Sequence, residues 1–85
     1  MIPNENTTAD LLERITFNKE VLAGKPLLRG LRISVDMILE LLAKGASPQE
    51  ILEDYPMLEP DDLRAALFYA HHLVAGERVL DRVAA

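Results

Sequence analysis

Three prolines in the second half of the chain fix where helices can begin and end. Ser47, Pro48 and Glu50 form the run S-P-Q-E, which combines a capping serine, a proline suited to the first helical position and the glutamate of a capping box. Pro56 closes the short helix that this run opens, since the residue before a proline avoids the helical region. Pro60 suits the first turn of a further helix. The sequence therefore predicts a short helix after Ser47 and a second helix beginning at Pro60.

Apolar side chains at helical spacing predict one more helix upstream and extend the helix that begins at Pro60. The upstream helix begins at Ser34 and ends at Gly45, and its apolar positions repeat at i, i+3, i+4 and i+7. Those positions are Val35, Ile38, Leu39 and Leu42. The stripe after Pro60 consists of Leu63, Ala66, Leu67, Ala70 and Leu73 or Val74. We expect Gly76 to end that helix, because glycine commonly follows the last periodic residue, and the residues after it to form either a last helical turn or a partner contact.

The segment before these helices is typical of a short β-hairpin. Residues 15–17 are β-branched or aromatic and read as a strand, and Gly24 with Pro26 marks a turn. Leu27 and Leu28 supply the second strand, which Pro26 can only begin or border, because proline cannot donate to a ladder. The expected fold is mainly α, with this hairpin followed by three helices.

The expected organisation is a single domain between two short tails. We place the tails at residues 1–14 and 77–85 and the domain at residues 15–76, with its last two helices in a helix-turn-helix arrangement. The chain has 85 residues and no cysteine, so neither a disulfide nor a cysteine-based metal site can reinforce a core of this size. With 49% hydrophobic residues, dimerisation is the remaining way to bury more apolar surface.

The absence of cysteine suits a reducing compartment, and no apolar run approaches the ~20 residues that span a bilayer. The first residues have no basic and apolar signal segment. We therefore expect a cytoplasmic protein that does not enter a membrane.

Charge is distributed unevenly along an acidic chain whose net charge is −5. Residues 14–32 carry +4, whereas residues 33–85 carry −6, so the overall charge disfavours non-specific DNA binding while one basic segment remains. In that segment Lys25, Arg29 and Arg32 are candidates for contacting a phosphate or carboxylate, since Arg pairs bidentately with either anion. The alternative is that the arginines pair with acids on the helices and hold the hairpin against them.

Three blocks of the sequence resemble the domain of unknown function 433 family. They read G-K-P-L-L-R-G-L-R-I-S-V, L-L-A-K-G-A-S-P-Q-E-I-L-E-D-Y-P-M-L and D-D-L-R-A-A-L-F-Y-A, and they lie in that order between Ile15 and His72. The family often reads R-G-T-R-I-P-V, whereas this chain has Leu31 in place of the threonine and Ser34 in place of the proline. The resemblance implies a homeodomain-like three-helix fold preceded by a hairpin. It also implies an antitoxin that neutralises a PIN-like nuclease toxin.

A helix-turn-helix protein reads DNA with the beginning of its second helix. Here that region carries Glu59, Asp61 and Asp62, which phosphates would repel, so the basic hairpin is the better candidate for contacting operator DNA. Partner or homodimer contacts are expected from apolar and aromatic residues near the end of the chain, although one aromatic side chain could simply lie half-exposed. These candidates are Phe68, Tyr69, His72, Val79, Leu80 and Val83.

Catalysis and metal binding have little support in the sequence. His71 and His72 are adjacent and point about 100° apart on a helix, so they do not form a metal pair. No nucleophile motif is present. We therefore expect no enzyme, no cofactor and no metal, and three hypotheses remain: an antitoxin, a DNA-binding regulator, and a structural or scaffold module.

Overall fold

The computed structural model describes the backbone of residues 8–84 and the side chains of residues 9–76. In this part of the chain the elements are α1 (Thr8–Leu12), β1 (Ile15–Thr16), the one-turn helix η1 (Leu22–Gly24), β2 (Leu27–Leu28), α2 (Val35–Ala43), α3 (Pro48–Asp54) and α4 (Pro60–Ala84). The mainly helical class and the short hairpin preceding three helices are confirmed. The homeodomain-like helix-turn-helix geometry stays a prediction.

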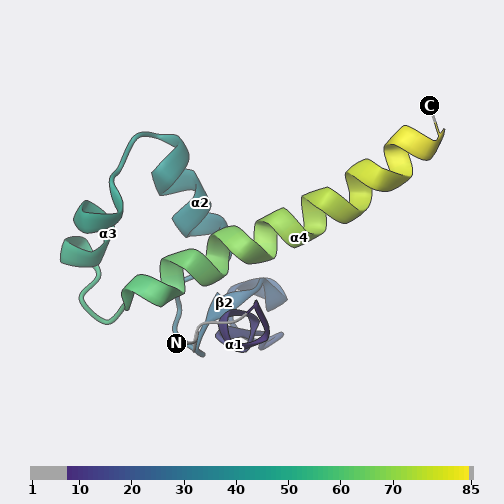
Figure 1. Cartoon of the computed structure of the whole chain (residues 1–85). Coiled ribbons are helices and arrows are strands. Elements are labelled where there is room, and N and C mark those ends of the chain that lie inside the picture. Colours follow the sequence, from purple (N-terminus) through teal and green to yellow (C-terminus); the bar gives the residue numbers. More distant parts are fainter. Residues whose placement is uncertain (1–7, 85) are drawn as a thin grey trace, which may run out of the picture.

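The long helix α4 is the element on which the others pack. Figure 1 shows α2 and α3 on one side of its first half, and α1 with the hairpin on the other side. Its second half extends away from all of them toward the C-terminus. The core is therefore confined to the first half of α4.

The hairpin is extended by the chain that leads into α2. Strands β1 and β2 are antiparallel, with Ile15 opposite Leu28, and Ser34 forms an isolated bridge with Leu27 on the other side of β2. The carbonyl of Pro26 accepts the backbone N–H of Val35 at 2.9 Å. Leu27 and Leu28 are fully buried as a result.

Side-chain caps fix the beginnings of α2 and α3. Ser34 accepts the backbone N–H of Met37 at 3.0 Å, which makes it the N-cap of α2. At α3, Ser47 accepts the N–H of Glu50 at 3.1 Å, and the Glu50 carboxylate accepts the N–H of Ser47 at 2.8 Å. The capping box that the sequence predicts is confirmed.

The N-terminal boundary differs from the prediction of a tail over residues 1–14. Residues Thr8–Leu12 form α1, and Leu11 is buried in the core against α4. The buried apolar residues of the core are Leu11, Leu28, Ile33, Val35, Ile38, Ile51, Leu58, Leu63, Ala65 and Ala66. A segment of five residues is too short to show helical periodicity, which is why the pattern did not reveal it.

The end of α4 also differs from the prediction. The helix does not end at Gly76 but continues to Ala84, through the residues expected to be a tail. A glycine inside a helix costs about 1 kcal/mol relative to alanine, which its helix-forming neighbours outweigh when no proline follows. Of the predicted apolar stripe, Leu63 is buried, whereas Leu67, Leu73 and Val74 are 50%, 51% and 51% exposed.

Candidate functional site

The three cations of the predicted site occupy three different environments. Arg29 is held by an acid of α4, Lys25 by an acid of α2, and Arg32 lies beside an open hollow. The structure therefore does not bring the three together as one anion-binding cluster.

Arg29 is committed to Asp62. Its Nε lies 2.9 Å from Oδ1 and its Nη2 lies 2.8 Å from Oδ2, while Nη2 also donates to the carbonyl of Met57 at 2.8 Å. The Asp62 side chain is fully buried, although it lies on the first turn of α4. Of the two interpretations of Arg29, this arrangement matches the second, in which the arginine pairs with an acid of the helices and holds the hairpin against them.

Arg14, directly before β1, completes the cluster, and the sequence analysis missed it because it lay in the expected tail. Its Nη1 donates to Asp62 at 3.0 Å and to Glu59 at 2.8 Å. The two arginines are brought together by the hairpin, since the Arg29 N–H donates to the Arg14 carbonyl at 2.7 Å. The position of this arginine directly before the first predicted strand was the one feature of the sequence that could have indicated its role.

The Asp62 carboxyl is held ionised in spite of its burial. Burial raises the pKa of Asp62, but hydrogen bonds from Arg29, the Glu59 backbone N–H and Arg14 together outweigh it, so the pKa is lowered. The Glu59 N–H lies 2.8 Å from Oδ2. The same contacts raise the pKa of Arg14, through Glu59 first, and the pKa of Arg29, through Asp62.

These contacts offset the negative charge of the acids at the beginning of α4. Glu59 and Asp62 are paired with Arg14, and Asp61 pairs with Arg64 at 3.1 Å. The acids expected to repel phosphates are thus each matched by a nearby arginine.

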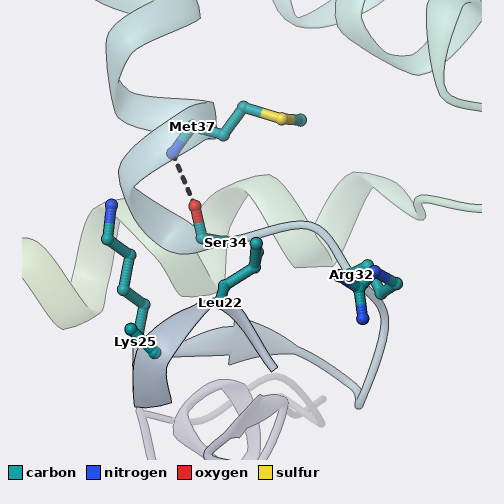
Figure 2. Close-up of a pocket in the computed structure, with 6 residues that line it drawn as sticks. Leu22, Lys25, Arg32, Ser34 and Met37 are labelled. Carbon is teal, nitrogen blue, oxygen red and sulfur yellow. Dashed lines mark hydrogen bonds between the residues drawn. The ribbon is translucent and has the colours of Figure 1, made fainter. Parts of the chain in front are cut away.

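Lys25 and Arg32 flank an open hollow of about 540 Å³ between η1 and the beginning of α2. Lys25 pairs with Asp36 at 3.1 Å, and both of these side chains are largely exposed. Arg32 makes no hydrogen bond or ion pair with any side chain that the structure describes. Figure 2 shows the two cations on opposite sides of Leu22 and Ser34.

The wall formed by η1 has a left-handed backbone. Leu22 and Ala23 have φ values of 49° and 58°, followed by Gly24 at 80°. Residues with a Cβ adopt this region at a cost, which the surrounding hydrogen bonds of the turn must offset. The turn presents Leu22 to solvent, 40% exposed, at the edge of the hollow.

Of the six candidate interface residues, three have side chains that the structure describes, and three do not. Tyr69 is half-buried and its ring lies 6.3 Å from that of Phe17, and Phe68 stacks on His71 at 5.9 Å. His72 is exposed. The side chains of Val79, Leu80 and Val83 lie outside the described residues.

Within residues 9–76, no three acidic or histidine side chains are grouped so that they could hold a metal ion. No helix in the described part of the chain is long and apolar enough to cross a membrane.

The family model for "Protein of unknown function (DUF433)" matches residues 15–70, which include the hairpin, α2, α3 and the packed half of α4. The chain belongs to the DUF433 family.

Two proteins illustrate the similarity. A crystal structure of a DUF433 member from Anabaena variabilis ATCC 29413 has 28% sequence identity and a TM-score of 0.69, covering 99% of this chain and 87% of that one. The uncharacterized protein y4eO of Sinorhizobium fredii (strain NBRC 101917 / NGR234) is 34% identical over 58 residues. That match covers 68% of this chain but only 26% of y4eO, so this domain corresponds to about a quarter of its relative.

Proposed function

We propose that this DUF433 protein is a non-enzymatic interaction protein, the antitoxin of a toxin–antitoxin pair, and that it binds a PIN-like nuclease toxin through α4. The observation that carries the proposal is the exposed apolar surface of this helix between Leu67 and Val74. Leu67, Leu73 and Val74 are each about half exposed. Exposed apolar groups on one face of a helix mark a surface that a partner covers.

The spacing fits a helix that lies in a groove of its partner. Leu67, Ala70 and Val74 fall at i, i+3 and i+7, the positions from which an amphipathic helix anchors in an apolar groove. A helical segment that has left its own core is marginally stable by itself, so a partner's groove would also stabilise the helix. The net charge of −5 would speed association with a basic nuclease that binds RNA.

The same surface supports the proposal of a homodimer, in which two copies of α4 bury these residues against each other. A cytoplasmic location accords with both partners, because the chain has no cysteine that would require oxidation. The proposal includes no enzymatic role, and it gives Asp62, whose buried carboxylate is engaged by arginines and the backbone, a structural role.

Co-expression with the product of the neighbouring gene tests the antitoxin proposal. We expect the tagged chain to co-purify with that protein and to relieve the growth arrest that it causes. Val74→Asp should abolish co-purification, whereas Met57→Asp, which alters a side chain that is also 51% exposed but lies before α4, should not. A neighbour that neither binds nor arrests growth contradicts the proposal.

A DNA-binding regulator is the second candidate, favoured by Arg32, which has no ion-pair partner among the described side chains, and by Lys25, whose ion pair with Asp36 is exposed. It would use a homeodomain-like arrangement of α3 and α4 with the hairpin facing the operator. Arg29 would not take part, because Asp62 engages it. Two phosphate contacts predict that log K falls with log salt at a slope of about −2. Binding to the upstream DNA with that slope, lost in Arg32→Ala, is the test.

A further inference from the structure

We infer that the hollow between η1 and α2 is a binding site for an acidic peptide segment of another protein, in which a carboxylate is flanked by apolar side chains. The carboxylate pairs with Arg32, and the apolar side chains rest on Leu22 and Met37. The inference is independent of the antitoxin proposal, because it concerns a different surface from the exposed apolar face of α4.

The lining of the hollow is suited to a ligand of mixed character. Leu22, Ala23 and Met37 provide apolar walls, and the cationic groups of Lys25 and Arg32 stand on either side (Figure 2). The volume of about 540 Å³ lies within the range of about 300–1,000 Å³ that is usual for binding pockets. Because the hollow is open, a short extended chain can cross it from one side to the other.

Arg32 is the cation best placed to hold the carboxylate. Its guanidinium has no partner among the described residues, whereas those of Arg14 and Arg29 are engaged by acids. A guanidinium presents a planar fork that matches the two oxygens of a carboxylate. The Lys25 ammonium has a secondary role, because it is already paired with Asp36.

The walls are held in place before any ligand binds. Ser34 is buried and caps α2, and the Val35 N–H donates to the Pro26 carbonyl beneath the hollow. On the opposite wall, backbone hydrogen bonds from Gly24 to Val21 and from Lys25 to Leu22 close the left-handed turn. A preformed site loses little conformational entropy when it binds a ligand.

The balance of apolar and charged lining favours a peptide over nucleic acid. A phosphate backbone would have to bring its charges past exposed Leu22 and past the carboxylate of Asp36, which lies beside Lys25. Contacts with nucleic acid are mostly to phosphates and need several cations together. Here, within residues 9–76, the hollow offers one arginine without an ion-pair partner, next to apolar side chains.

Titration of the ¹⁵N-labelled full chain with two matched peptides tests the inference by NMR. The probes are acetyl-Leu-Glu-Leu-amide and acetyl-Leu-Gln-Leu-amide, which differ only in the charge of the central side chain. We expect the Glu peptide to shift the amide signals of residues 22–25 and 32–37 and to bind at least about threefold more tightly than the Gln peptide, as expected for an exposed ion pair.

Three variants assign the charge preference to its residues. Arg32→Ala should reduce the preference for the Glu peptide to about onefold, and Arg64→Ala, which removes an exposed arginine from α4, should leave it unchanged. Asp36→Asn should strengthen binding of the Glu peptide about twofold, because it removes a competing carboxylate from Lys25.

Equal binding of the two peptides, or an equal effect of the Arg32 and Arg64 substitutions, would overturn the inference. So would a peptide that causes no shifts while a double-stranded oligonucleotide shifts the same amides, since the hollow would then be a nucleic-acid contact. All variants keep their buried side chains, so thermal unfolding serves only to verify that they are folded.

Discussion

Arg29 and Asp62 form a two-pronged ion pair across 33 residues of sequence, with Nε and Nη2 of the arginine 2.9 and 2.8 Å from the two carboxylate oxygens. The arginine itself has a φ of 49°, so the turn that follows β2 adopts a left-handed backbone at the residue that reaches α4. The hairpin and the long helix are therefore joined at one buried carboxylate, which Arg29 shares with Arg14, the residue directly before β1.

Removing the carboxylate should destabilise the whole domain. Asp62→Ala leaves two arginines without their shared partner, and we expect the free energy of unfolding to fall by about 3 kcal/mol. The value lies at the low end for a buried pair because the Arg14 and Arg29 side chains are 25% and 32% exposed. Urea unfolding measures it, with Asp36→Asn, which removes an exposed pair, as a control expected to change by less than about 1 kcal/mol.

The same carboxylate should make stability depend on acid pH. Because the folded-state pKa of Asp62 is lowered below its ordinary value of 3.8, its contribution is complete above that value and is lost as pH falls through the folded pKa. Urea midpoints measured between pH 7 and pH 2.5 should fall more steeply for the natural sequence than for Asp62→Asn. If the urea midpoints of the two proteins fell equally with pH, Asp62 would not be the group that makes stability depend on acid pH.

Relieving the left-handed turn should stabilise the protein. Ala23 has a φ of 58°, which glycine adopts without a Cβ penalty, so we expect Ala23→Gly to raise the free energy of unfolding by about 0.5 kcal/mol after the entropy of the unfolded chain is included. Ala43→Gly at the end of α2 provides the opposite case and should lower it by about 0.5–1 kcal/mol. Thermal unfolding of both variants shows whether the two changes in the free energy of unfolding have opposite signs.

Gly76 should control how much of α4 is helical. A Cβ at this position meets no atom within 4 Å, so Gly76→Ala should increase helicity and stabilise the helix by about 1 kcal/mol. Gly76→Pro should interrupt the helix and remove the far-ultraviolet circular dichroism signal of the residues beyond it. No loss of helical signal in the proline variant would contradict the helix that continues to Ala84.

Self-association should depend on the exposed face of α4. If two copies bury Leu67 and Val74 against each other, sedimentation of the natural chain gives a concentration-dependent dimer, and Val74→Asp gives a monomer. Met57→Ser, which alters an apolar side chain that is 51% exposed before α4, is the control and should leave the dimer intact. A monomer at all concentrations would contradict the homodimer, and the exposed face of α4 would then be expected to bind a different protein.

The features that the sequence predicted well are those that depend on near neighbours. The capping box at Ser47 and Glu50 involves residues three apart, so its chemistry can be recognised from spacing alone. The hairpin was likewise visible from a turn and two apolar strands. The family resemblance agreed with both, because it rests on the same local blocks.

What escaped prediction depends on contacts between distant segments. The shared partner of Arg14 and Arg29 is Asp62, and the residue types alone do not distinguish that fully buried acid from its neighbour Asp61, whose side chain is 24% exposed. The exposure of Leu73 could not be foreseen either, because periodicity shows that a helix has an apolar face but not where its own core stops. For the same reason the pattern suggested one cluster of cations where the structure has three environments.

Because one carboxylate holds both Arg14 and Arg29, the hairpin can be anchored only late in synthesis of the chain. Translation delivers the two arginines of the hairpin well before Asp62, which follows Arg29 by 33 residues and Arg14 by 48. The nascent hairpin must therefore wait for the beginning of α4 to leave the ribosome before its anchorage exists. A chain truncated before Pro60 retains both arginines without their buried partner, and quality-control proteases should recognise such a fragment as unfolded.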